Sequence, residues 1–174
     1  MVDLIRTIDE RFNLRFALEE DVTLILQFIK ELADYENLLH EVVATEEILL
    51  DSLFKRKAAE VIIGEYDGEP IGFALFFHNF STFLGRPGIY LEDLYVRPIM
   101  RGKGLGKVML SYLAKLALER GCGRLEWWCL DWNEPSIKFY KNLGAIPMDE
   151  WTVYRVRDTA LHDLGEAFDV NKKL

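Results

Sequence analysis

The chain has 174 residues, a length that suits one domain built around a single hydrophobic core. Half of the residues are apolar and 29% are charged, which is typical of a globular protein and excludes a disordered or collagen-like chain. Lys and Arg number 21 against 29 Asp and Glu, so the formal net charge is −8. An acidic surface repels phosphate backbones, and the composition therefore predicts no nucleic-acid partner. The acidity either suits small cationic molecules or serves solubility alone.

The residue pattern also predicts the compartment. Cys122 and Cys129 form neither a CxxC pair nor a disulfide framework, so both are expected to be reduced thiols in a cytoplasmic protein. The first ten residues mix acidic with apolar side chains and lack the apolar core of a signal peptide. No apolar stretch reaches the roughly 18 residues that a membrane span needs. The three histidines lack metal-ligand spacing, so no metal site is predicted: His40, His78 and His162.

The N-terminal part is predicted to contain one strand and two helices. Residues 1–11 are expected to be a loose leader, and residues 13–18 alternate in polarity as a strand does. Apolar residues at helical spacing predict a helix over 20–34. A second helix is expected to begin at the capping residue Thr45 and to run through Phe54.

A group of strands follows in the middle of the chain. Strands predicted over 59–66 and 71–79 flank Asp67-Gly68, a dipeptide that accepts the positive φ of a tight hairpin. Residues 80–88 are expected to form a loop, and residues 89–96 a further strand. Later elements alternate between helix and strand: a helix over 105–120 ended by Gly121 and Gly123, a buried strand over 125–130, a helix over 135–142, a strand over 151–156 and a helix over 159–168.

The order of elements, β-α-α-β-β-β-α-β-α-β, predicts an α/β (α+β) fold. Three consecutive strands joined by hairpin-length loops should be antiparallel. The strand–helix–strand unit from residue 89 to 130 should be parallel and right-handed. The expected result is a mixed, mostly antiparallel central sheet flanked by helices, formed by residues 1–174 as a single domain.

A glycine-rich turn precedes the strongest predicted helix. It reads Arg101-Gly102-Lys103-Gly104-Leu105-Gly106-Lys107 and presents backbone N–H groups beside the positive end of a helix dipole. This arrangement with three cations predicts a diphosphate site, while the simpler alternative is a tight turn that needs positive φ. A P-loop would need Gly at position 101, and a dinucleotide fingerprint would need Gly at position 107, so ATP-type and NAD-type sites fit poorly.

The pattern Arg101-x-x-Gly104-x-Gly106 between a strand and a helix is similar to motif A of the GNAT N-acetyltransferases. Three further segments resemble the diamine (spermidine/spermine) acetyltransferase branch of that superfamily, and most of all its thialysine-type members. These segments are Tyr90-Leu91-Glu92-Asp93, Asn133 to Lys141 followed by Gly144-Ala145, and Ile29 to Glu36. The resemblance implies a GNAT fold, transfer of an acetyl group from acetyl-CoA to a primary amine, and a homodimer with its sites near the subunit interface.

The resemblance also implies which residues bind the cofactor. Main-chain groups of a strand are expected to pair with the pantetheine amides and to stabilise the thioester oxygen, motif A to hold the diphosphate, and two polar residues to contact the cofactor arm. The strand residues are Leu94, Tyr95 and Val96. The motif A residues are Arg101, Gly102, Lys103, Gly104, Leu105, Gly106 and Lys107, and the two polar residues are Asn133 and Ser136.

Two residues are expected to carry the proton transfers. An alkylammonium must lose a proton before it attacks, and the resemblance makes Glu92 the base, directly or through a water. Because neighbouring side chains of a strand alternate, Asp93 should face away from Glu92. Tyr140 is expected to protonate the leaving thiolate. The simpler alternative for Glu92 is a carboxylate held in a salt bridge. Without the resemblance, a helical tyrosine such as Tyr140 is more often a packing residue.

Carboxylates and an aromatic residue are expected to hold the amine substrate. The candidates are Tyr35, Glu36, Glu92, Asp93 and Glu150. Polyamine-preferring relatives carry an acid near the position of the neutral Thr82, so a lysine-like or short diamine substrate is favoured over spermine. Two alternatives stay open: a protein or peptide acetyltransferase on the same scaffold, and a non-catalytic acyl-CoA-binding module.

Overall fold

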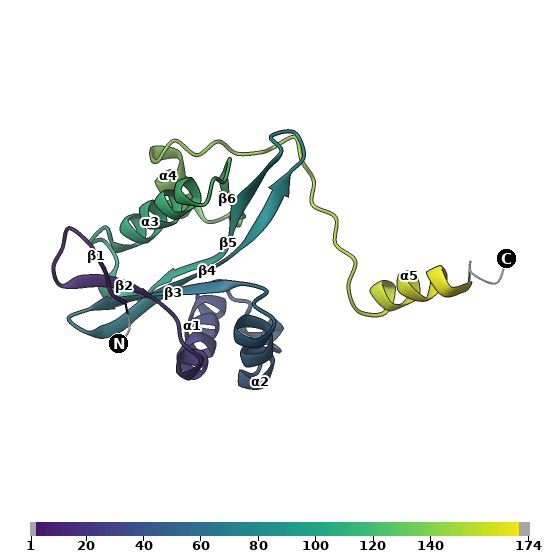
Figure 1. Cartoon of the computed structure of the whole chain (residues 1–174), viewed down its shortest axis with the longest axis horizontal. Helices are drawn as coiled ribbons and strands as arrows, with labels where there is room; N and C mark the ends of the chain where they lie inside the picture. The colour runs from purple at the N-terminus through teal and green to yellow at the C-terminus, as the bar shows by residue number, and fades with distance from the viewer. Residues whose placement is uncertain (1–2, 171–174) are drawn as a thin grey trace. The chain divides into compact units, whose positions relative to one another are not determined.

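The computed structural model describes residues 3–170 and divides into two compact units. The first unit ends at Trp128 and contains the whole sheet with helices on both of its faces (Figure 1). The second unit starts at Cys129 and contains two helices.

Six strands form one sheet in the order β1-β2-β3-β4-β5-β6. All neighbouring pairs are antiparallel except β5 and β6, which are parallel as predicted for the crossover unit. The sheet is therefore mixed and mostly antiparallel, and this confirms the predicted fold class. The strands are β1 (Ile5–Arg6), β2 (Phe12–Phe16), β3 (Glu60–Tyr66), β4 (Glu69–Ser81), β5 (Arg86–Val96) and β6 (Leu125–Trp127).

The expected loose leader differs from the structure. Among its described residues, Ile5 pairs with Leu14 and Arg6 with Asn13, so β1 is an edge strand of the sheet. The Thr7 hydroxyl donates to the Phe12 carbonyl over 2.6 Å and closes the turn between β1 and β2. A strand of two residues has too short an alternation to be recognised in a sequence.

The hairpin between β3 and β4 confirms the turn predicted at Asp67-Gly68. Asp67 has a φ of 53° and Gly68 a φ of 84°, as a two-residue turn with two left-handed positions requires. The Arg11 guanidinium forms an exposed ion pair with Asp67, which links this hairpin to the β1–β2 turn.

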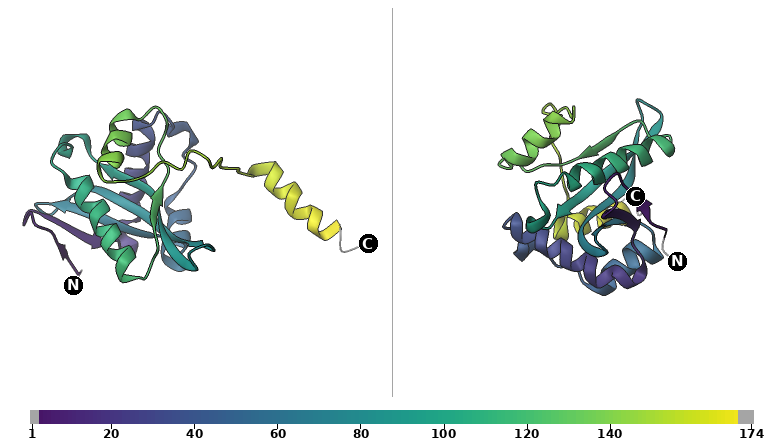
Figure 2. Two further views of the ribbon diagram at one scale, coloured as in Figure 1. Left: turned by 90° about the horizontal axis from the view of Figure 1, so that it is seen from above. Right: turned by 90° about the vertical axis from the view of Figure 1, so that its left-hand side faces the viewer.

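Helices cover both faces of the sheet (Figures 1 and 2). One face carries α1 (Val22–Tyr35), α2 (Glu46–Leu49) and the π-helical turn η3 (Leu50–Lys55), and α3 (Leu105–Glu119) lies on the other. The core under α1 contains Phe28, stacked on Phe73 of β4 with ring centroids 5.5 Å apart, and the buried Tyr95 of β5. Thr45 caps α2 as predicted: its hydroxyl accepts from the Ile48 N–H over 3.3 Å.

The opposite face packs on α3 through a close approach at Gly64. A Cβ at this position would lie 3.0 Å from the Phe12 ring and 3.4 Å from the Met109 sulfur. Both side chains are almost fully buried, at 0% and 1% exposure. Glycine at position 64 therefore lets α3 lie close to β2 and β3.

Several predicted boundaries are wrong. The loop expected over 80–88 shrinks to four residues because β4 runs to Ser81 and β5 starts at Arg86. The strand expected over 125–130 ends at Trp127 and is half-buried rather than buried. Residues 151–156, expected to form a strand, have no regular secondary structure and are exposed. Alternating apolar residues favour a strand, but a strand also needs a neighbour to bond with.

The second unit contains α4 (Glu134–Asn142) and α5 (Asp158–Val170). Short 3-10 turns η1 (Glu19–Asp21), η2 (Leu39–Glu41) and η4 (Pro98–Met100) occur in the first unit. Within residues 3–170, no helix combines the length and the apolar character needed to span a bilayer.

Candidate active site

The glycine turn leads directly into α3. Gly102 has a φ of 80° and Gly104 a φ of 78°, a left-handed conformation that is strained for any residue with a Cβ. A Cβ at either position would meet no atom within 4 Å, so conformation rather than crowding requires these glycines. The turn explanation of the motif is therefore correct for two of its glycines, and the open space around them leaves the backbone accessible.

The first turn of α3 offers backbone donors that the helix does not use. Val108 N–H donates to the Gly104 carbonyl over 3.1 Å, which is the first bond of the helix. The N–H groups of Leu105, Gly106 and Lys107 precede that bond and have no intrahelical acceptor. Gly104, the N-cap, provides no side-chain oxygen for them. Free donors at the positive end of a 15-residue helix fit a diphosphate.

The three cations of the turn play different roles. The Arg101 Nε donates to the Val96 carbonyl over 2.9 Å, and the guanidinium lies 4.5 Å from the centroid of the Tyr35 ring. Lys103 Nζ lies 5.1 Å from the Tyr66 ring, and Lys107 is exposed at the start of α3. Arg101 thus links the turn to the end of α1, a contact that its place in the motif does not predict.

The C-terminal half of β5 has one unpaired edge. Its pairing with β6 covers only Ile89 to Leu91, whereas its pairing with β4 continues to Val96. In the part of the chain that the structure describes, Leu94, Tyr95 and Val96 therefore have a strand neighbour on one side only. The backbone groups of this edge can bond an extended ligand in the manner of an added strand. Tyr95 is 4% exposed as a whole residue, whereas Leu94 and Val96 are half-buried, so the accessible part of this edge lies at these two residues.

A β-bulge lies at Glu92. Leu75 of β4 pairs with Asp93 and the next residue, Phe76, pairs with Leu91, so Glu92 is the extra residue of β5. Because Leu75 and Phe76 point to opposite faces, Asp93 and Leu91 also do, although they are two residues apart. Asp93 therefore shares the face of Tyr95 and of α1. The regular alternation of side chains is thus broken between Leu91 and Asp93, and the prediction that Glu92 and Asp93 face apart stays a prediction.

Three carboxylates interact at this point. Burial raises the pKa of Asp93 to about 7, and repulsion from Glu92 and Glu36 adds to the rise. Burial also raises the pKa of Glu36, the C-cap residue of α1. Glu92 is exposed beside them. The end of α1 and the bulge of β5 thus form an acidic surface that suits a cation, and one of its carboxylates gains or loses a proton near neutral pH.

The remaining predicted site residues belong to the second unit. Asn133 is the N-cap of α4, and its Oδ1 accepts from the Ser136 N–H over 3.4 Å, so these two residues contact each other. Tyr140 is half-buried on α4 with its ring 5.3 Å from that of Phe139. Glu150 is exposed in a turn after α4. Asn133 therefore has a structural role in capping the helix that its motif position did not reveal.

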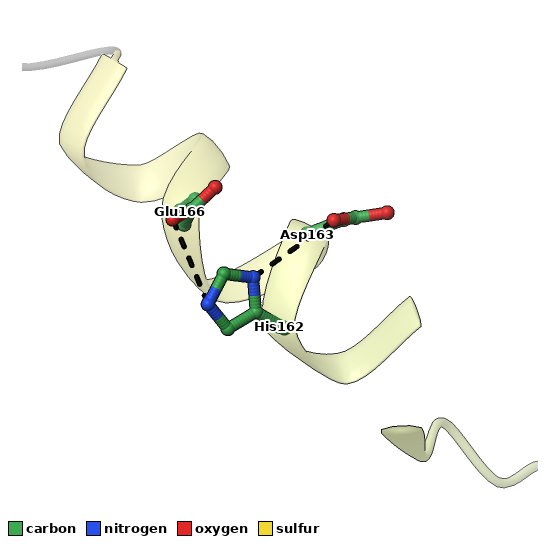
Figure 3. A group of neighbouring side chains, drawn as sticks. All are labelled: His162, Asp163 and Glu166. Carbon is green, nitrogen blue, oxygen red and sulfur yellow. Dashed lines mark ion pairs between the residues drawn. The ribbon is translucent and has the colours of Figure 1, made fainter. Parts of the chain in front are cut away.

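Helix α5 carries a histidine and two acidic residues close together, and side chains of these types can bind metal ions. Of the residues with described side chains, His162, Asp163 and Glu166 have ligand atoms that lie within 4.8 Å of one another (Figure 3). The imidazole lies between the two carboxylates, with Nδ1 3.9 Å from Asp163 and Nε2 3.6 Å from Glu166. All three side chains are exposed, and ion pairing with solvent-exposed acids explains the arrangement fully. We assign no metal to it.

The sequence did not predict one ion pair of the first unit, which joins α1 to the end of β5. Arg97, directly after β5, contacts Glu31 of α1 over 3.1 Å. Glu31 lies within the segment Ile29 to Glu36 that resembles the family, but nothing in the sequence indicates a contact with Arg97, because that contact depends on how α1 packs on the sheet.

Comparison with known proteins places the chain in a family. Residues 25–145 match the acetyltransferase (GNAT) family model. A thialysine N-epsilon-acetyltransferase from Bos taurus is 37% identical over 164 residues, which cover 87% of this chain and 96% of that protein. An L-ornithine N5-acetyltransferase from Arabidopsis thaliana is 31% identical and covers 88% of each chain.

A solved structure shares the fold. An integron cassette protein from the mobile metagenome of V. cholerae superimposes with a TM-score of 0.75 at 26% identity, over 89% of this chain and 98% of that one. Members of this family use acetyl-CoA as cosubstrate. The chain belongs to the GNAT family of acetyltransferases.

Proposed function

We propose that this acetyltransferase transfers the acetyl group of acetyl-CoA to a primary amine of a small cationic, lysine-like molecule such as thialysine, ornithine or a short diamine. The observation that supports it most is the composition of the first unit. There, a helix N-terminus with free N–H donors and an unpaired strand edge flank a bulge that bears adjacent carboxylates. The relatives that act on thialysine and ornithine support the substrate class.

The cofactor is proposed to lie between two sets of backbone groups. The N–H groups of residues 102–107 would bind the diphosphate, helped by the exposed Lys103 and Lys107. The edge of residues 94–96 would pair with the pantetheine amides and donate to the thioester oxygen as negative charge develops there, an effect worth about 3 kcal/mol per donor. Asn133 and Ser136 of the second unit complete the proposed cofactor contacts. When bound, acetyl-CoA supplies the activated acetyl group.

The carboxylates are proposed to hold and deprotonate the amine. Tyr35 and Glu36 at the end of α1, with Asp93 and Glu150, attract the ammonium group. Glu92 accepts a proton from it, directly or through a water, because an ammonium with a pKa near 10 has no lone pair to attack with. The neutral amine then forms the new C–N bond as the C–S bond breaks, and the nitrogen releases to solvent the extra proton that it carries after the attack.

Tyr140 is proposed to donate its proton to the departing thiolate. Tyr140→Phe is expected to lower kcat more than tenfold with little change in acetyl-CoA affinity, because only the hydroxyl is removed. Steady-state kinetics together with calorimetric titration measure both quantities. Phe139→Leu, next to it on α4, is the matched control and should keep most of kcat. An unchanged kcat in Tyr140→Phe would exclude Tyr140 from the reaction.

The substrate class can be tested with a panel of amines. We expect thialysine, ornithine, lysine and putrescine to give higher kcat/KM than spermine when CoA release is measured. The neutral Thr82, in the exposed turn between β4 and β5, offers no carboxylate for a second distant ammonium. A strong preference for spermine would contradict this choice. CoA binding without turnover on any amine would favour a non-catalytic acyl-CoA-binding module. Turnover on a peptide alone would favour a protein or peptide acetyltransferase.

The proposal extends to the organisation of the protein. We propose that the two units act together as one acetyltransferase domain, since the family match at residues 25–145 includes residues of both units.

We also propose a cytoplasmic homodimer. Cys122 is buried and Cys129 half-buried, and neither forms a disulfide, which agrees with a reducing compartment. Light scattering of the purified chain tests the dimer, and a mass of one chain would contradict it.

A further inference from the structure

Arg97 joins three elements of the first unit at the end of β5. Its Nε and Nη2 donate to the Glu31 carboxylate of α1 over 3.2 and 3.1 Å. Its Nη1 donates to the Pro70 carbonyl of β4 over 3.2 Å. The guanidinium also lies 5.0 Å from the Phe28 ring centroid, so its apolar face is covered by α1 as well. Three of the five N–H groups of this side chain are therefore directed at protein acceptors, which hold it in one position.

Glu31 is the common acceptor of this contact. Besides Arg97, it accepts from Gln27 over 2.7 Å and from the Tyr95 hydroxyl. Burial alone would raise the pKa of Glu31, but the hydrogen bonds from Arg97, Gln27 and Tyr95 outweigh it and lower the pKa. The side chains of Glu31 and Arg97 are only 27% and 31% exposed, so this pair is less screened than a surface pair.

The pair links the two elements that carry the proposed amine site, α1 and the end of β5. On α1, Tyr35 and Glu36 follow Glu31 by about one helical turn. On β5, Asp93 is two residues before Tyr95. Because Glu36 and Asp93 repel each other, their charges act to separate the end of α1 from the strand. The Arg97–Glu31 pair and the Tyr95 hydroxyl oppose that separation.

We infer that Arg97 and Glu31 are positioning residues that set the distance between an amine held at the end of α1 and the edge of β5 where the acetyl group is delivered. The inference rests on the proposed function of this site. Neither residue touches the reacting atoms in this account. Loosening their contact would let α1 move relative to β5, which misplaces the amine. Residues 94–96 keep their pairing with β4, and the donors of residues 105–107 stay within α3, so the backbone groups proposed for the cofactor do not depend on this contact.

The test compares Arg97→Met with Arg120→Met. Arg120, on the far side of the unit, forms a similarly half-buried pair with Glu60 of β3, with Nη2 donating over 2.8 Å. Both variants lose one arginine–carboxylate pair, and thermal unfolding measures the stability that each loses. Arg97→Met should lower kcat/KM for the preferred amine at least tenfold, leave the KM of acetyl-CoA within twofold, and change the ratio of kcat/KM between a short and a long diamine at least threefold.

Arg120→Met should leave that ratio unchanged at an equal loss of stability. Arg97→Lys, which keeps the charge beside Glu31, should recover part of kcat/KM, and Glu31→Gln provides a second way to weaken the contact if Arg97→Met does not fold. Equal behaviour of the Arg97 and Arg120 variants would overturn the positioning role alone. A wild-type chain that acetylates no amine would instead overturn the proposed function, and the inference with it.

Discussion

Glu92→Gln is expected to lower kcat for amine acetylation about a hundredfold, the effect typical of removing a general base. Glutamine keeps the size of the side chain and its place at the bulge but cannot accept the proton. Because Glu92 is exposed, the substitution should change thermal stability little. The affinity for acetyl-CoA should also stay within twofold, since the backbone groups that bind it are unaffected.

The pH profile of Glu92→Gln provides a sharper test than the rate alone. Asp93 has a pKa of about 7 in part because Glu92 repels its ionised form. Removing the Glu92 charge should lower the pKa of Asp93. Any remaining activity that needs ionised Asp93 should therefore extend to lower pH. Glu69→Gln, an exposed position at the start of β4, is the control and should alter neither kcat nor the profile. Full activity of Glu92→Gln would exclude it as the base.

Asp93→Asn is expected to stabilise the protein at pH 8 more than at pH 5. In the fold the pKa of Asp93 is about 7, above the ordinary value of 3.8, so folding takes up a proton between these values. The unfolded chain binds fewer protons in this window, and the free energy of unfolding therefore falls as the pH rises toward 7. Asparagine removes this dependence. Its advantage over wild type should grow by about 2 to 3 kcal/mol between pH 5 and pH 8.

Urea denaturation of both proteins at the two pH values measures this difference. Asp51→Asn changes an aspartate on η3 whose contact with Arg56, at 3.8 Å, is exposed. It should leave the pH dependence as in wild type. Parallel stability profiles for wild type and Asp93→Asn would contradict the buried, repelled state of Asp93. The same variant should raise the KM of the amine, because it removes one of the carboxylates proposed to hold it.

The sequence predicts elements well where local chemistry decides them. The turn at Asp67-Gly68 adopts positive φ at both residues, and Gly104 ends a left-handed turn at the start of α3. In both cases the residue type itself limits the backbone. The parallel pairing of β5 with β6 follows from the helical connection through α3 and is also correct.

The candidate site is less predictable because it depends on pairing between distant segments. The bulge at Glu92 arises from the register of β5 against β4, and no alternation of residues in β5 reveals it. The same holds for the contact of Arg97 with Glu31 and for the edge strand β1, whose residues separately show no pattern. Residues 151–156 show the reverse: their alternation favours a strand, but they have no strand neighbour within the described residues.

Calorimetric titration of the purified chain with CoA tests most directly whether the N-terminus of α3 grips a diphosphate. The account predicts saturable heat with a micromolar dissociation constant, weakened at least tenfold by Gly104→Val, since a branched side chain strains a left-handed φ and covers the donors beside it. No heat at millimolar CoA would contradict it.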